Sequence, residues 1–112
     1  MSQRETIFGA IRASGIDGTH LAWPVGKAPD LPWFVYETDR DPFYADDDNY
    51  SEDVRVAVHL YERAQDEATE DAFYANLRRA FGPVSPGVDT WLADENCFVT
   101  TYRFTYHPTK GE

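Results

Sequence analysis

The residues from Val54 to Tyr61 alternate strictly between aliphatic and other side chains. The aliphatic positions are 54, 56, 58 and 60, and the positions between them hold Arg55, Ala57, His59 and Tyr61. A period of two is the period of a β-strand, whose successive side chains point to opposite faces of the sheet. The pattern therefore predicts a strand with its aliphatic side in the core and a mixed polar and aromatic opposite side.

Residues 66–81 have the period of a helix instead. Acidic residues crowd the start of this segment and Arg78 and Arg79 lie at its end, an arrangement that complements the helix dipole. The apolar stripe consists of Phe73, Leu77, Ala80 and Phe81. Because Gly82-Pro83 follows directly, we expect a helix from Asp66 to Phe81 with this stripe buried.

The N-terminal segment predicts a second helix, and the remaining apolar segments predict strands. Ser2 and Glu5 form a capping box, and Gly15 supplies a stop, so we expect a helix at 3–13. Strands are expected at 33–37, 88–93 and 97–106, which are rich in β-branched and aromatic residues. Residues 20–33 contain three prolines and predict an ordered loop, with a short strand possible at 20–23 and two tryptophans anchoring the loop to the sheet.

These elements predict an α+β fold in one domain, residues 1–112. The expected order is α-β-β-α-β-β, with a single four-stranded, mainly antiparallel sheet and two helices packed on one of its faces. A chain of 112 residues has room for one such core and for no second domain.

The charge of the chain is strongly acidic and unevenly distributed. The formal net charge is −10, and eight of the twenty acidic residues fall between Glu37 and Asp53 against one base, Arg40. An acidic surface repels nucleic acid and anionic lipid, so direct binding to DNA is disfavoured. No apolar run approaches the length of a membrane span and the N-terminus has no signal-peptide pattern, so a soluble, reducing compartment is expected.

No residue pattern indicates an enzyme, a cofactor or a metal site. The aspartates between Asp39 and Asp48 lack the glycine and the spacing of a calcium loop. His20, His59 and His107 lie on separate segments, without the short spacing of zinc ligands. Cys97 is the single cysteine, and its acidic neighbours raise the pKa of a thiol, which favours a packing role.

The order of the motifs resembles a family of proteins from tailed phages and prophages. The matching features are the PWFVY segment, the YADDDNY segment, the alternating strand that ends in LYE, and the run TWLADENCFVTTYRFTY. Within them the matching positions are Tyr44, Asp46, Tyr50, Leu60, Tyr61, Glu95, Tyr102 and Phe104. The family is that of the small minor tail proteins, the tail-terminator or tail-completion proteins that join head and tail, and the resemblance covers nearly the whole chain.

The resemblance implies a non-catalytic structural protein of the virion, located in the tail or neck and made in the cytoplasm of the bacterial host. Subunits of such proteins close into a ring, commonly a hexamer, that stops growth of the tail tube and contacts tail-tube and head-connector proteins. A ring needs two different complementary patches on each subunit. The residues expected at this interface are Asp39, Asp41, Phe43, Tyr44, Asp46, Asp47, Asp48, Tyr50, Arg55, Arg63, Arg78, Arg79 and Arg103.

Three alternatives to a tail terminator remain at this stage. A head-closure or neck protein of the same particle fits the same pattern. An acidic inhibitor that mimics DNA would use the run Asp46 to Asp48, whose change to Asn would abolish binding to a nucleic-acid enzyme. An enzyme would require a pocket around His20, Trp23 and Trp33.

Overall fold

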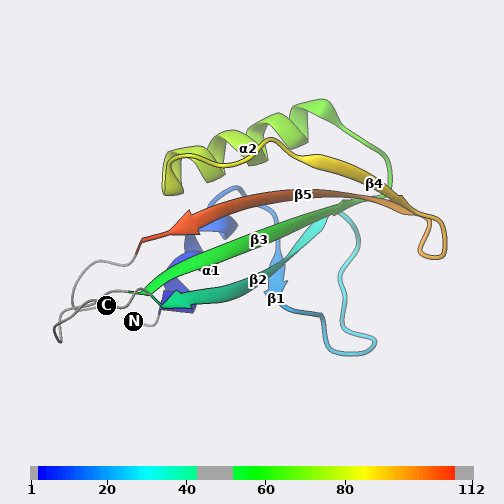
Figure 1. The fold of residues 1–112 in the computed structure, drawn as a ribbon. Coiled ribbons are helices and arrows are strands. Elements are labelled where there is room, and N and C mark those ends of the chain that lie inside the picture. The colour runs from blue at the N-terminus through cyan, green and yellow to red at the C-terminus, as the bar shows by residue number, and fades with distance from the viewer. Residues whose placement is uncertain (1–2, 43–51, 108–112) are drawn as a thin grey trace, which may run out of the picture.

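The computed structural model describes residues 3–42 and 52–107 of the chain. Its elements, in chain order, are α1 (Gln3–Arg12), β1 (Gly18–His20), β2 (Trp33–Pro42), β3 (Glu52–Glu62), α2 (Glu67–Phe81), β4 (Val88–Leu92) and β5 (Cys97–Tyr106) (Figure 1). The strands form one sheet in the order β1-β2-β3-β5-β4. The α+β class is confirmed, with two helices and a mixed sheet.

The expected four-stranded sheet is wrong by one strand, because β1 lies parallel to β2 at its edge. Gly18 to His20 pairs with Phe34 to Tyr36, and the Leu21 N–H donates to the Tyr36 carbonyl. Three residues are too few to produce a periodic signal, and the short strand that seemed possible at 20–23 instead ends at His20. There Leu21 turns the chain with a φ of 67°.

Gly18 makes this parallel pairing possible. A Cβ at Gly18 would lie only 2.3 Å from the ring of Phe34, so any larger residue would displace that ring from the core. A glycine within a strand often marks such a close approach.

The other four strands form the two expected antiparallel hairpins, β2–β3 and β4–β5, which join through β3 and β5. Strand β2 extends five residues past the expected end at Glu37, and β3 begins at Glu52. Both ends of the predicted acidic connection at 39–53 are therefore strand, because cross-strand pairing continues from Glu37 opposite Ala57 to Pro42 opposite Glu52. The centre of that connection, residues 43–51, lies outside the described residues.

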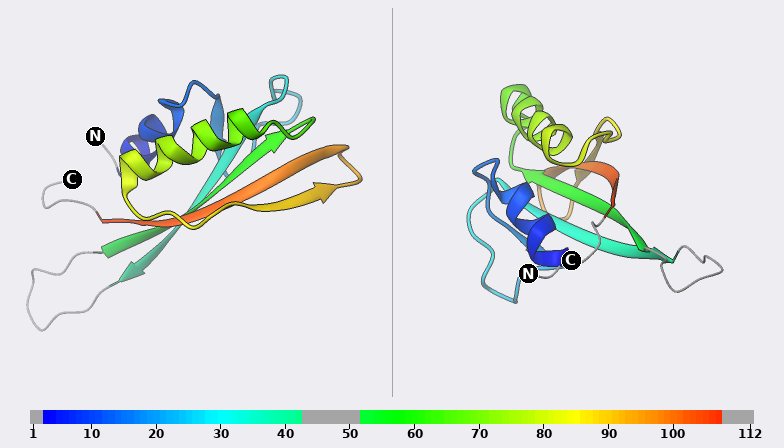
Figure 2. Two further views of the ribbon diagram at one scale, coloured as in Figure 1. Left: turned by 90° about the horizontal axis from the view of Figure 1, so that it is seen from above. Right: turned by 90° about the vertical axis from the view of Figure 1, so that its left-hand side faces the viewer.

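Both helices cover the same face of the sheet (Figure 2). Ile7 and Ile11 of α1 and Phe73 and Leu77 of α2 are fully buried. They pack on the even-numbered side chains of β2, β3 and β5, which include Phe34, Tyr36, Val54, Val56, Val58, Leu60, Tyr102 and Phe104. The predicted aliphatic face of the alternating strand is thus confirmed as core.

The buried stripe of α2 differs from the expectation at one position. Phe73 and Leu77 are buried and Phe81 stacks on Phe104 at 4.2 Å between ring centroids, but Ala80 is exposed. Phe73, Leu77 and Phe81 follow one another at intervals of four residues and so lie in one row along the helix. The buried residue beside this row is Asn76. The helix is therefore rotated so that Asn76, and not Ala80, faces inward.

Asn76 joins the two helices. Its side-chain amide Nδ2 donates to the carbonyls of Ala10 at 3.0 Å and Ile11 at 3.5 Å in the last turn of α1, where the Ile11 carbonyl also accepts from the Ser14 N–H at 3.1 Å. Gly15, with a φ of 93°, then leads the chain away from the helix. The one polar side chain buried in the apolar face of α2 thus has a specific capping role.

Candidate functional site

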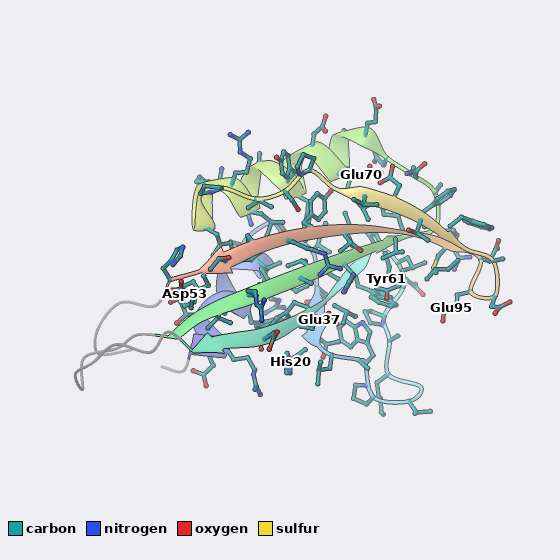
Figure 3. The ribbon with its side chains drawn as sticks, in the orientation of Figure 1. His20, Glu37, Asp53, Tyr61, Glu70 and Glu95 are labelled. Atoms are coloured by element: carbon teal, nitrogen blue, oxygen red, sulfur yellow. The ribbon has the colours of Figure 1, made fainter. Side chains whose placement is uncertain are left out.

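The face of the sheet opposite the helices is covered by no described element (Figures 2 and 3). We call it the uncovered face. It carries the odd-numbered side chains of β2, β3 and β5 together with the β4 side chains that lie opposite them. They include Trp33, Val35, Glu37, Asp39, Arg55, Ala57, His59, Tyr61, Val99, Thr101, Arg103, Thr105, Val88 and Thr90.

Charged side chains on this face pair across strands. Asp39 of β2 lies opposite Arg55 of β3, and the Arg55 Nη2 donates to the Asp39 Oδ2 at 2.8 Å. The His59 Nε2 is 3.7 Å from the Glu37 Oε2, while its Nδ1 is 2.9 Å from the Thr101 hydroxyl. These contacts fix most of the polar groups of β2 and β3 in place.

A hollow of about 700 Å³ occupies the centre of the uncovered face. Glu37, Ala57 and Arg103 lie side by side across three strands, and all three line the hollow. Ala57 has the smallest side chain on this face, so it forms the floor between a carboxylate on β2 and a guanidinium on β5. The hollow therefore has one acidic wall and one basic wall.

Arg103 lies between this hollow and a second one of about 280 Å³, which is lined by Ser85, Val88, Thr90 and Thr101. Its backbone is fixed, because its N–H donates to the Ser85 hydroxyl and its carbonyl accepts from the Ser85 N–H. No ion pair within the described part of the chain includes its side chain, which is exposed. A guanidinium with five donors on a fixed strand suits a carboxylate from outside the domain.

Apolar and aromatic side chains border this charged centre. Leu21 lines the first hollow and Val88 the second, and both are about two-thirds exposed. At the far end Trp33 packs on Tyr61 at 4.5 Å, and Trp23 meets the edge of Trp33 at 5.9 Å. The prediction that Trp23 and Trp33 anchor the 20–33 loop to the sheet is thus confirmed.

The five predicted interface arginines fall in three separate places. Arg55 and Arg103 share the uncovered face, and Arg63 is exposed just past the end of β3. Arg78 and Arg79 lie in the last turn of α2, where Arg78 contacts the ring of Tyr74 and Arg79 donates to Asn76 at 2.9 Å. Of these five arginines, only Arg55 and Arg103 therefore lie on the uncovered face.

The predicted acidic interface residues are described only in part. Asp39 lies on the uncovered face, but it pairs with Arg55 of the same chain. Asp41 lies in β2 by its backbone, and the positions of Phe43, Tyr44, Asp46, Asp47, Asp48 and Tyr50 lie outside the described residues. Asp39 and Arg55, which the sequence assigned to opposite patches, thus form one neutral pair.

Sequence reasoning missed Leu21, Glu37, Ala57 and Val88 at this site. The alternating pattern does place Ala57 beside Arg55 on the non-core side of β3, which is a signal that was available. No sequence signal gave the registers that set Glu37 and Arg103 on either side of Ala57, because strand register depends on pairing across the sheet.

The groups considered for other chemistry lie apart from one another. His20 contacts the ring of Tyr36, and His107 is 2.9 Å from an oxygen of Asp53. Burial and the carboxylate of Glu95 raise the pKa of the Cys97 thiol, which is consistent with the packing role expected from the sequence. Across residues 3–42 and 52–107, no three His, Cys, Asp or Glu side chains are grouped to hold a metal ion.

None of the helices in the described parts of the chain has the length and apolar character needed to span a membrane. No protein-family model matches the chain, and no curated protein sequence is significantly similar to it. The geometry of the uncovered face and the order of the sequence motifs are therefore the two features that bear on function.

Proposed function

We propose that this chain is a structural, non-catalytic subunit of a tailed phage or prophage particle. In this proposal it is a tail terminator that assembles into a ring at the head-proximal end of the tail. Its partners are further copies of itself, the tail-tube protein and the head-connector protein. A head-closure protein of the same neck region would use the same kind of contacts.

The observation that carries the proposal is the uncovered face. Antiparallel sheets often present one polar face to solvent, but this face combines Arg103, which has no ion-pair partner among residues 3–42 and 52–107, with exposed Leu21 and Val88. Exposed apolar side chains around polar groups are typical of protein-binding surfaces. The two hollows give a neighbouring subunit a shaped surface on which to bind.

Ring closure also requires a second, complementary patch on each subunit. An acidic patch fits best, because Arg103 is an exposed cation without an ion-pair partner in the described part of a chain whose net charge is −10. Arg55 contributes less to such a contact, since Asp39 already neutralises it. The acidity would also let DNA pass through a ring without adhering to it.

Light scattering on the purified chain tests the proposal, first alone at high concentration and then with the tail-tube protein. We expect a mass corresponding to a closed ring in at least one of these conditions. A chain that stays monomeric throughout and binds neither the tail-tube nor the connector protein would rule out this function.

A further inference from the structure

Two glutamates from different elements meet beneath the first turn of α2. Glu62 is the last residue of β3 and is only 3% exposed, although it carries a carboxyl group. Glu70 lies in the first turns of α2 (Figure 3). The Glu62 Oε1 and the Glu70 Oε2 are both buried, and neither has a hydrogen-bond donor among the described residues. Burying two acceptors without donors costs free energy, unless a proton lies between them and forms a hydrogen bond.

Further carboxylates lie near this pair. The charge of Asp66, the N-cap of α2, acts on Glu62, while Asp71 of α2 and Asp89 of β4 act together with the two glutamates on the buried Tyr102 of β5. Asp89 accepts a hydrogen bond from Thr100, and Asp66 caps α2 through the N–H groups of Ala68 and Thr69. In the described parts of the chain no ion pair includes Glu62 or Glu70, so no cation offsets their charge.

These surroundings favour the neutral form of a carboxyl group. Burial, followed by a hydrogen bond and charge repulsion from Glu70, raises the pKa of Glu62 to about 7, while a hydrogen bond from the Asp66 backbone acts in the opposite direction. The pKa of Tyr102 is also raised, by burial and then by the nearby carboxylates, so its hydroxyl stays protonated and neutral.

We propose that Glu62 and Glu70 share one proton, and that the resulting carboxyl pair is a pH-dependent latch that holds the first turn of α2 on the end of β3. With the proton present, the O–H of one carboxyl donates to an oxygen of the other. When the proton leaves to water, the pair gains one negative charge and loses its hydrogen bond. The inference does not depend on the proposed function.

The direction of the pH effect follows from the raised pKa. The folded protein keeps this proton at pH values where the unfolded chain has released it, so the latch stabilises the fold fully below about pH 4.5. The contribution declines as the pH rises and is lost above about pH 7. Two facing carboxylates then repel each other, and the first turn of α2 separates from β3 while the rest of the helix stays packed through Phe73 and Leu77.

The test compares the wild type with Glu62→Gln, whose amide can donate to the ionised Glu70 without a shared proton. Glu67→Gln makes the same change at an exposed position on the same turn and serves as the control. We expect Glu62→Gln to melt within about 2 °C of the wild type at pH 5 and more than about 5 °C above it at pH 8. Glu70→Gln should behave in the same way, and Glu67→Gln should follow the wild type.

Carbon-13 NMR of the carboxyl groups gives a second, independent readout on the wild-type chain. We expect the Glu62 carboxyl to titrate near pH 7, and amide exchange at Ala68, Thr69 and Glu70 to become faster above that pH after correction for intrinsic rates. Titration of Glu62 below pH 5.5 would overturn the latch. Stabilisation by Ca²⁺ or Mg²⁺ that requires both glutamates would also overturn it, because the site would then hold a cation and not a proton.

Discussion

Replacing Phe73 by alanine is expected to lower the free energy of unfolding by about 3–5 kcal/mol. Phe73 is fully buried, and its ring contacts those of Phe34 on β2 and Tyr102 on β5 at 6.0 and 5.7 Å between centroids. Its removal would leave a cavity where α2 meets the centre of the sheet. Because domains of this size are stable by about 5–15 kcal/mol, the loss is a large part of the total, and urea denaturation would measure it.

Two control variants on α2 distinguish loss of packing from a general effect on the helix. Phe73→Leu keeps most of the volume and should cost less than Phe73→Ala. Ala80→Gln should change the stability by less than about 0.5 kcal/mol, because Ala80 is exposed. If Ala80→Gln were costly and Phe73→Ala harmless, the orientation of α2 on the sheet would be wrong.

Arg103→Glu is expected to weaken assembly or tail-tube binding by about 100-fold or more, while the domain keeps its stability. Reversing this charge removes the exposed guanidinium between the two hollows and places a second carboxylate across the first hollow from Glu37. Losing one partner of a charge pair that becomes buried in an interface costs about 2–5 kcal/mol. Titration followed by light scattering or calorimetry would measure the change.

Arg78→Glu is the matched control for this variant. It makes the same charge change on an exposed arginine, but in the last turn of α2 on the other side of the sheet. We expect it to assemble as the wild type does. An equal loss of binding affinity in Arg78→Glu and Arg103→Glu would indicate that net charge, and not the uncovered face, governs assembly.

The long, strongly periodic elements of this fold could be predicted from the sequence. The strand around Val54 to Leu60 has its aliphatic side in the core as its alternation indicates, and the predicted bounds of β5 agree with the structure. Helix α2 begins at Glu67, one residue after the expected start, because Asp66 is its N-cap, and it ends at Phe81 as expected. In these segments the local sequence pattern and the tertiary packing favour the same structure, so the pattern alone is sufficient to predict the element.

The sequence could not predict features that depend on pairing between distant segments. Strand β1 has three residues and exists because Gly18 lets the backbone pass over the ring of Phe34. Asp39 and Arg55 neutralise each other because of the β2–β3 register, which the charge pattern does not contain. The choice between Asn76 and Ala80 as the inward residue of α2 was decided by the end of α1, whose carbonyls Asn76 caps.

The sequence predicted which kinds of residue form the candidate site, but not how they are arranged. Arg55 and Arg103 were expected at an interface, and both lie on the uncovered face. The hollow between Glu37 and Arg103 needs three strands in register, and the exposure of Leu21 follows from the turn that ends β1. Such surfaces are properties of the assembled sheet and have no linear motif.

Oxidative footprinting of the chain, free and in its complex with the tail-tube protein or with further copies, would show directly whether the uncovered face is the binding surface. We expect Leu21 and Val88, which border this face, to become protected from oxidation in the complex. Trp91, which is nearly half exposed and packs on Phe98 on the helix side of the sheet, should react as before. Protection of Trp91 with unchanged oxidation of Leu21 and Val88 would contradict the account, because the partner would then bind elsewhere.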